Sequence, residues 1–207
     1  MDETGEMVFP IHGFEYYQNA FMSAIDEEAI RKTNFKLVLD YSYGSSSRIF
    51  TSILGRLNCE VIALNANLDG SKTTKTAEEF SKALYQLSTI VRSLGADLGV
   101  LLDAGGEKVF LVDDSGEILD GDTALNIVML LAMKGTKPCV KKDQIAAPIT
   151  ASRAIENLAS TYGYKVKRTK TSARGLMEAA MDPSVAIVGE PTGGLIFPQF
   201  QPNFDGM

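Results

Sequence analysis

A short acidic loop offers the first residue types that could do chemistry. Asp103 directly follows an apolar run, residues 98–102, and Gly105, Gly106 and Glu107 come soon after it. Hard cations such as magnesium bind several converging oxygens, commonly carboxylates at alternate positions of a loop. The alternate positions here are Asp103, Gly105 and Glu107, so one carboxylate of such a set is missing. The pattern permits two interpretations, an incomplete cation site and a plain hairpin with charged turn residues.

A second glycine loop, G-E-P-T-G-G, follows another apolar run near the end of the chain and spans residues 189–194. Glu190 offers a hydrogen-bond acceptor, and Thr192 offers a hydroxyl that both donates and accepts. An acid and a hydroxyl held on a loop with Gly193 suit the hydroxyl groups of a sugar. The alternative is a hairpin turn, for which the same glycine and proline residues are typical.

A basic segment provides a third candidate. Lys170 and Arg174 flank a hydroxyl-rich turn that precedes a predicted helix. Hydroxyls, backbone N–H groups and a helix N-terminus together favour an anion such as phosphate. Lys165, Lys167 and Arg168 come just before, on a predicted strand, and basic residues there are also typical of a solvated edge that blocks strand pairing. Both interpretations stay open.

Other polar residues give little evidence of a catalytic or binding role. His12 is the only histidine, and no paired nucleophile motif accompanies it, so we expect neither a catalytic triad nor histidine–metal chemistry. Residues 43–47, Y-G-S-S-S, precede a predicted helix but lack the lysine and the spacing of a P-loop. We predict an N-cap there and assign no catalytic residue in the chain.

Composition narrows the class of protein. The 207 residues are 45% hydrophobic and 22% charged, as in an ordinary soluble globular protein, and a formal net charge of -6 argues against general nucleic-acid binding. The longest apolar run, residues 124–133, is too short to span a membrane, and no signal peptide opens the chain. Cys59 and Cys139 each open an apolar run without a C-x-x-C pattern, which predicts reduced, buried thiols and a cytoplasmic protein.

The elements that must position these loops follow from the spacing of apolar residues. In the first half, Asp26 is predicted to cap a second helical piece, Thr76 and Glu79 to form a capping box, and Gly95 to end the long helix that follows. The expected elements are residues 14–32 (helical, in two pieces), 35–39 (strand), 47–57 (helix), 59–64 (strand), 76–94 (helix), 98–102 (strand) and 109–112 (returning strand).

The second half repeats this order without repeating the residues. The expected elements are residues 123–134 (helix), 135–138 (turn), 144–150 (strand), 152–162 (helix), 164–170 (strand), 173–181 (helix), 184–189 (strand) and 195–200 (strand). Strand–helix–strand units imply parallel strands with right-handed crossovers. We therefore predict an α/β protein of two similar α/β/α modules, residues 14–120 and 121–207, each with a mixed, mostly parallel sheet of about four strands.

The order of these segments resembles the two middle domains of the α-D-phosphohexomutases, the phosphomannomutase and phosphoglucomutase family. The run F-K-L-V-L-D-Y-S-Y-G from Phe35 is similar to the opening of the second domain, and residues 93–116 are similar to its end. The runs I-T-A-S-R-A-I-E-N-L-A, R-T-K-T-S-A-R and G-E-P-T-G-G resemble the third domain. The resemblance covers residues 14–207.

In that family a loop D-G-D-x-D-R holds magnesium beside a phosphoserine. The resemblance places Asp103 at the first metal aspartate, Gly105 at the second, Glu107 at the third and Lys108 at the arginine. It implies a degenerate metal site, Asp103 with Glu107, at which we do not expect functional magnesium binding. A further hypothesis, an active metal-dependent enzyme, would need a third carboxylate from the returning strand, namely from Asp113 or Asp114.

The family's other loop, G-E-x-S-G-H, binds sugar hydroxyls. By resemblance Glu190 and Gly193 keep their roles, Thr192 stands for the serine, and Gly194 replaces the histidine. The resemblance thus implies that a hexose phosphate is the ligand, with Lys170 or Arg174 near its phosphate.

The differences between these two loops and the family's loops determine the function that we expect. Phosphoryl transfer depends on positioning and charge neutralisation around a metal, and the family's phosphoserine domain and phosphate-binding fourth domain have no match in these residues. We expect a phosphohexomutase-type fragment from carbohydrate and sugar-nucleotide metabolism that is not catalytic alone. The ending F-P-Q-F-Q-P-N-F-D also resembles the degenerate C-terminal module of mannose-1-phosphate guanylyltransferase fusions. That likeness implies an attached nucleotidyltransferase domain and, as the alternative, a structural or regulatory role.

Overall fold

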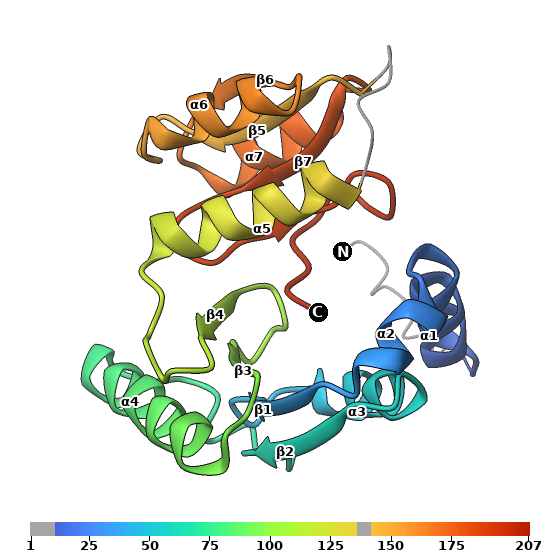
Figure 1. The fold of residues 1–207 in the computed structure, drawn as a ribbon, viewed down its shortest axis with the longest axis vertical. Coiled ribbons are helices and arrows are strands. Elements are labelled where there is room, and N and C mark those ends of the chain that lie inside the picture. The colour runs from blue at the N-terminus through green and yellow to red at the C-terminus, as the bar shows by residue number, and fades with distance from the viewer. Residues whose placement is uncertain (1–10, 136–141) are drawn as a thin grey trace, which may run out of the picture.

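Two sheets organise the protein, and Figure 1 shows the path of the chain between them in a computed structural model that describes residues 11–135 and 142–207. Over these residues the sheets have four strands each, in the orders β2-β1-β3-β4 and β6-β5-β7-β8. In each sheet three strands are parallel and the fourth returns antiparallel. The prediction of two α/β modules with mixed, mostly parallel sheets is confirmed.

The N-terminal module contains the first sheet and its helices. Its elements are α1 (Gly13–Ala24), α2 (Glu27–Thr33), β1 (Lys36–Asp40), α3 (Ser47–Arg56), β2 (Glu60–Leu64), α4 (Ala77–Leu94), β3 (Leu98–Leu102) and β4 (Val109–Val112). Asp26 caps α2 as predicted, because its side chain accepts a hydrogen bond from the Ala29 N–H. Thr76 and Glu79 form the predicted capping box of α4, and Gly95 ends that helix in the left-handed conformation.

Helices cover both faces of this first sheet. Successive side chains of β1 point to opposite faces, so Leu39 packs with Ile53 of α3 whereas Val38 packs with Leu87 of α4. All four side chains are fully buried, and each such burial contributes about 1.5–3 kcal/mol. The loops at the end of the sheet therefore rise from a rigid base.

The C-terminal module contains the second sheet. Its elements are α5 (Gly121–Gly135), β5 (Gln144–Pro148), α6 (Ala154–Thr161), β6 (Lys165–Thr169), α7 (Ala173–Ala180), β7 (Val185–Gly189) and β8 (Leu195–Ile196). Helices α5 and α6 pack on one face and α7 on the other. β8 is shorter than the predicted strand over residues 195–200, because Pro198 lacks an N–H for the ladder and residues 197–200 form a turn.

The cysteine prediction is corrected in part. Cys59 is a free thiol next to the start of β2, but it is only half-buried, because β2 is the outer strand of its sheet. This partial burial raises the pKa of its thiol. Cys139 and the turn predicted after Gly135 lie outside the described residues. Within the described ranges, no helix combines the length and the apolar character needed to cross a membrane.

The loops that carry the candidate residues meet at one edge of each sheet. β1 has β2 on one side and β3 on the other, so the connections change direction between β1 and β3. Ligands of such sheets bind at the carboxyl ends of the strands at this point. Gly44, after β1, packs against Ala104, after β3, so closely that a Cβ at position 44 would lie 2.3 Å from the Ala104 carbonyl oxygen. The equivalent edge of the second sheet carries Glu190, directly after β7.

The two modules contact each other through the same loops. A backbone bridge joins Lys108 to Gly194, and the Val109 N–H donates to the Gly193 carbonyl oxygen at 3.0 Å. Figure 1 shows α5 between the two sheets and the last residues of the chain reaching down from the second module toward the first. These contacts place the loop after β3 beside the hairpin after β7.

Candidate functional site

Asp103 organises the loop between β3 and β4. Its Oδ1 accepts hydrogen bonds from the N–H groups of Glu107, at 2.7 Å, and Lys108, at 3.0 Å. Its carbonyl oxygen accepts the Gly106 N–H at 3.0 Å. The hairpin interpretation therefore describes the backbone here, with Asp103 stabilising the turn. The second carboxylate oxygen, Oδ2, accepts no hydrogen bond from the described part of the chain.

The residues of this loop do not fit the magnesium set that the resemblance implies. A Cβ at Gly105 would lie 3.7 Å from Asp103 Oδ2 and 3.5 Å from Glu107 Cγ, so the missing side chain is the one that would face the other two. Residues 11–135 and 142–207 contain no group of three side chains placed to hold a metal ion. Asp103 and Glu107 therefore supply two carboxylates, one fewer than the set that the resemblance implies.

The returning strand does not supply a third carboxylate. β4 pairs with β3 so that Val109 lies opposite Leu102 and Val112 lies opposite Gly99. Asp113, which follows β4, is therefore at the far end of the hairpin, about 13 Å from the end that carries Asp103. The hypothesis of a metal site that combines the two ends is wrong.

Residues 189–194 form a hairpin with a three-residue turn. The Glu190 N–H donates to the Gly194 carbonyl oxygen at 2.9 Å, and the Gly193 N–H donates to the Glu190 carbonyl oxygen at 3.1 Å. Gly193 closes the turn with a φ of +91°, a conformation that glycine adopts without strain. The hairpin and the sugar-loop interpretations are thus compatible, because the turn fixes the backbone and leaves the Thr192 side chain exposed beside the largely covered Glu190.

Lys108 links the two loops. Its Nζ donates to Thr192 Oγ1 at 3.1 Å and lies 3.5 Å from Glu190 Oε1. The Glu190 side chain is only 13% exposed, so this ion pair is shielded from solvent more than a free surface pair is. Lys108 is a candidate binding residue that the sequence pattern does not predict. The available signal was its place at the family's arginine.

Gly194 lets Glu190 adopt this position. A Cβ at residue 194 would lie 2.7 Å from Glu190 Oε1 and 2.7 Å from the ring of Phe204. The two side chains close over the glycine at the position where the family loop has histidine. A larger residue at 194 would have to displace Glu190 or Phe204.

The basic side chains of β6 are not a free phosphate site. Arg168 bonds both carboxylate oxygens of Glu156, at 2.7 and 2.8 Å, and also donates to three backbone carbonyl oxygens at the end of β5 and in the loop after it. Lys167 pairs with Asp182 at 2.5 Å. The solvated-edge interpretation is wrong for Arg168, whose side chain is 24% exposed and holds a loop in place.

Lys170 and Arg174 lie apart from the hairpin after β7. Arg174 is 89% exposed and donates to Glu178 at 2.8 Å. Within the described residues no hydrogen bond or ion pair joins either basic side chain to Glu190. Lys170 follows β6 and Glu190 follows β7, and β5 alone separates these strands, so the two strand ends lie about 10 Å apart.

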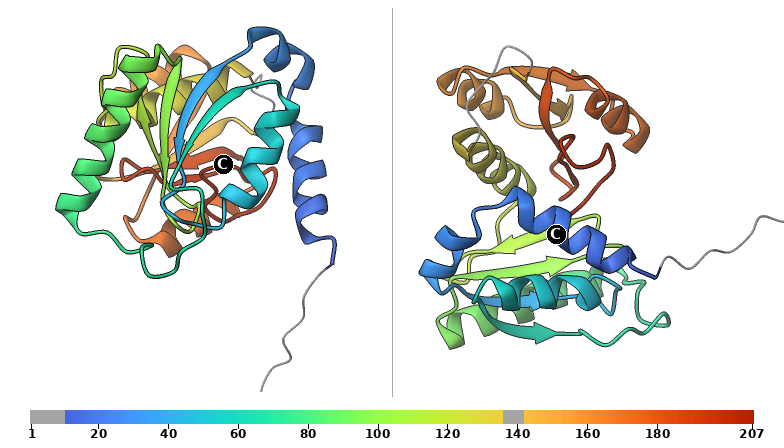
Figure 2. Two further views of the ribbon diagram at one scale, coloured as in Figure 1. Left: turned by 90° about the horizontal axis from the view of Figure 1, so that it is seen from below. Right: turned by 90° about the vertical axis from the view of Figure 1, so that its right-hand side faces the viewer.

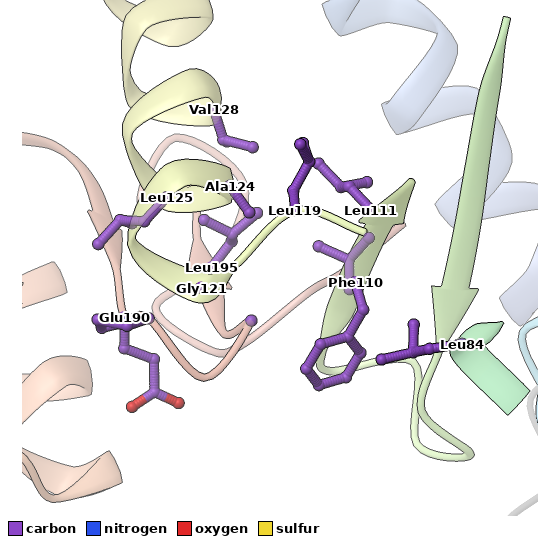
Figure 3. Close-up of a pocket in the computed structure, with 13 residues that line it drawn as sticks. Leu84, Phe110, Leu111, Leu119, Gly121, Ala124, Leu125, Val128, Glu190 and Leu195 are labelled. Atoms are coloured by element: carbon purple, nitrogen blue, oxygen red, sulfur yellow. The ribbon is translucent and has the colours of Figure 1, made fainter. Parts of the chain in front are cut away.

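A small cavity of about 210 Å³ lies between the modules, next to the hairpin. Figure 3 shows apolar side chains from β4, such as Phe110 and Leu111, on one side and those of α5 and β8, such as Leu125 and Leu195, on the other. The Glu190 carboxylate extends away from them. The cavity is too small and too apolar for a hexose phosphate. The polar face of the hairpin is therefore the candidate site.

The fold and the site together define an α/β/α protein whose two modules meet at a glycine hairpin with a carboxylate. Family models identify both modules. Residues 15–116 match phosphoglucomutase/phosphomannomutase, alpha/beta/alpha domain II, and residues 120–207 match alpha/beta/alpha domain III. The chain belongs to the phosphoglucomutase/phosphomannomutase family, of which it carries domains II and III.

Individual relatives agree with this assignment. A phosphoglucomutase/phosphomannomutase of Thermococcus kodakarensis is 30% identical over 190 residues, which is 92% of this chain and 41% of that protein. A phosphoglucosamine/phosphogalactosamine mutase of Sulfurisphaera tokodaii is 27% identical over 191 residues, 92% of this chain and 41% of that protein. The chain thus spans less than half the length of these relatives.

Solved structures support the fold. A phosphoglucomutase/phosphomannomutase family protein from Burkholderia thailandensis superposes with a TM-score of 0.73 at 20% identity, over 91% of this chain and 41% of that one. The phosphoglucomutase pp63/parafusin from Paramecium, in its open form, superposes with a TM-score of 0.72 at 16% identity, over 93% of this chain and 35% of that one. At these identities the likeness concerns the fold alone.

Proposed function

We propose that this chain is the sugar-recognising part of a phosphohexomutase-type protein and binds a hexose phosphate at the hairpin of residues 189–194. Glu190 accepts hydrogen bonds from sugar hydroxyls, and Thr192 both donates and accepts them. Lys108 neutralises part of the charge of Glu190 and offers a further donor. The relatives named above are mutases of hexose and hexosamine phosphates, which supports this class of ligand.

The observation that carries the proposal is the contact of Lys108, from the first module, with Glu190 and Thr192, from the second. Three polar side chains of both modules converge at a strand end where α/β proteins bind ligands. The end of β7 lies about 10 Å from the end of β6, and a hexose ring with its phosphate spans much of that distance. Lys170 is therefore assigned to the phosphate, with Arg174 nearby.

The chain by itself is proposed not to transfer a phosphoryl group. Such transfer needs charge neutralisation at the reacting phosphate, which a metal ion provides in many enzymes. The loop of Asp103 lacks the converging carboxylates for that ion. Binding without turnover is the expected property of these residues.

Titration of the isotope-labelled chain with mannose 1-phosphate and glucosamine 6-phosphate tests the proposal. We expect amide shifts centred on residues 189–194 and on Lys108, and a loss of affinity of about tenfold or more in Glu190→Gln, because charged acceptors form the stronger hydrogen bonds. Glu28→Gln, on the exposed surface of α2 where Glu28 pairs with Lys32, is the matched control and should bind as the parent does. Shifts confined to other surfaces, or unchanged affinity in Glu190→Gln, would refute the proposal.

A second candidate is a structural or regulatory module attached to a nucleotidyltransferase, as in mannose-1-phosphate guanylyltransferase fusions. The packing at Gly194 favours it, because Phe204 fills the space that a binding side chain would need. In this case the module would pack against its neighbour or join subunits and bind no sugar. The coding sequence on either side of these residues tests it, since a nucleotidyltransferase signature upstream is required.

A further inference from the structure

A second concave site lies away from the hairpin, between α1 and the segment after β8. Its volume is about 640 Å³, in the range of small-molecule sites. Figure 2 shows in its right-hand view that the C-terminal end of the chain runs beside α1. The lining residues with polar groups are Tyr17, Ser23, Gln199, Gln201 and Asp205, and those with apolar side chains include Phe21, Ile25, Phe197 and Phe200. We call it the α1 groove.

Asp205 is held in a fixed position in this groove. Its Oδ2 accepts the Tyr17 hydroxyl at 2.9 Å, and its Oδ1 accepts the Met207 N–H at 3.0 Å. Its own N–H donates to the Leu195 carbonyl oxygen at 2.9 Å, and the next residue, Gly206, donates its N–H to Gly106 in the first module at 2.8 Å. The carboxylate is thus positioned by both modules before any ligand arrives.

The charge of Asp205 is not compensated by the described residues. The described part of the chain places no lysine, arginine or histidine nitrogen within ion-pair distance of its carboxylate, and its partners are neutral donors. Tyr17 stays a neutral donor, because burial and the neighbouring carboxylate raise the pKa of its hydroxyl. Among the described lining residues Asp205 is the one charged side chain. A half-buried carboxylate of this kind favours a cation and disfavours a phosphate.

Aromatic rings form the walls beside this carboxylate. Tyr17 and Phe21 stack at 6.3 Å between centroids on α1, and Phe197 and Phe200 lie 6.4 Å apart on the opposite wall. Phe200 is 50% exposed although it is a large apolar ring. Aromatic faces attract cations, and an exposed ring next to a carboxylate is typical of sites that bind ammonium groups.

We propose that the α1 groove binds a small organic cation, an ammonium group on an apolar body, with the charge against Asp205 and the body between the rings of α1 and of residues 197–200. Charge complementarity selects this occupant over an anionic or neutral one. None of residues 189–194 lines this groove. It is formed jointly by both modules, so its ligand stabilises their contact.

Calorimetric titration of the whole chain with benzylamine tests the inference, with benzyl alcohol as a neutral ligand of the same shape. We expect benzylamine to bind about tenfold more tightly than benzyl alcohol at neutral pH, and to shift the amides of Tyr17, Phe21 and Gln201. Asp205→Asn should remove most of that preference, whereas Asp182→Asn, far from the groove, should keep it.

A second variant keeps the test decisive if Asp205→Asn loosens the segment after β8. Phe200→Ala removes an exposed ring that supports no core, so it should fold normally and weaken benzylamine binding several-fold. Equal binding of benzylamine and benzyl alcohol, shifts outside the α1 groove, or full affinity in the folded variants Phe200→Ala and Asp205→Asn would each overturn the proposal.

Discussion

At the scale of single residues, one glycine decides the chemistry of the loop after β3. Position 105 faces Asp103 and Glu107, its backbone has no left-handed φ, and a Cβ there meets only ordinary contact distances of 3.5 Å or more. The loop therefore has room for the missing carboxylate. The loop differs from the metal set that the resemblance implies by one side chain, and its backbone could hold that side chain.

We predict that Gly105→Asp creates a divalent-cation site, because a third carboxylate would converge with Asp103 and Glu107. The affinity for magnesium or manganese should rise roughly tenfold or more over the parent, as measured by calorimetry. Gly106→Asp adds the same charge at a φ of +72° and faces Ser46, so it should gain nothing and lose stability. Identical cation affinity in the parent and Gly105→Asp would contradict the prediction.

Aspartates that cap turns make the protein sensitive to acid. The Lys167 ammonium and the Ser184 hydroxyl hold the pKa of the Asp182 carboxyl well below its usual range. The folded state then binds fewer protons than the unfolded one, so this contribution to stability is present above about pH 4 and is lost as the pH falls toward the folded pKa.

Asp182→Asn is predicted to flatten this acid dependence. Between about pH 4 and pH 2 the free energy of unfolding should fall less steeply in the variant than in the parent, because the titrating group has been removed. Denaturant unfolding at several pH values measures the slope. Parallel curves for the two proteins would show that Asp182 is not involved.

At the scale of elements, Arg168 turns a loop into a rigid part of the second module. Its guanidinium joins β6 to Glu156 of α6 and to the carbonyl oxygens of Pro148, Ala151 and Ser152. These carbonyl groups would lose their donors if the guanidinium were removed. The loop after β5 borders the carboxyl edge of the sheet, so the clamp also supports the site.

Arg168→Met should lower the free energy of unfolding by about 2–4 kcal/mol, because several hydrogen bonds and a partly buried ion pair are lost together. Lys165→Met is the matched control on the same strand. Lys165 is 78% exposed and pairs with Asp143 at 3.2 Å, so its loss should change stability by about 0.5 kcal/mol or less. Chemical denaturation compares the two, and equal effects would rule out the clamp.

At the scale of the whole molecule, glycines allow the two modules to touch. A Cβ at Gly193 would lie 2.6 Å from the carbonyl oxygen of Val109 in the first module. Within the second module, a Cβ at Gly121 would lie 1.8 Å from the Pro191 carbonyl oxygen, so α5 also packs closely on the hairpin. A side chain at position 193 would force the hairpin away from β4. Because Lys108 precedes β4 directly, the convergence of polar groups at the candidate site depends on this close approach.

Gly193→Ala is predicted to destabilise the protein by at least about 2 kcal/mol, because it combines a positive φ with an overlap at the module contact. Faster hydrogen exchange of the Val109 N–H, which bonds to residue 193, should report the loosened contact. Gly70→Ala, with open space around it and no positive φ, should be neutral or slightly stabilising. Unchanged exchange at Val109 would argue against the role of Gly193.

The sequence by itself determined the order and type of the elements, because apolar periodicity, the cap of Thr76 with Glu79 and the turn glycines are local signals. It also predicted Asp103 and Glu190 at strand ends, and hence at one edge of each sheet. Only the tertiary structure decided what these residues touch. The contact of Lys108 with Glu190 and the α1 groove depend on how the two modules pack, and the contacts of Arg168 depend on how β6 packs against α6 and the loop after β5. No local pattern encodes these pairings, because each joins segments distant along the chain.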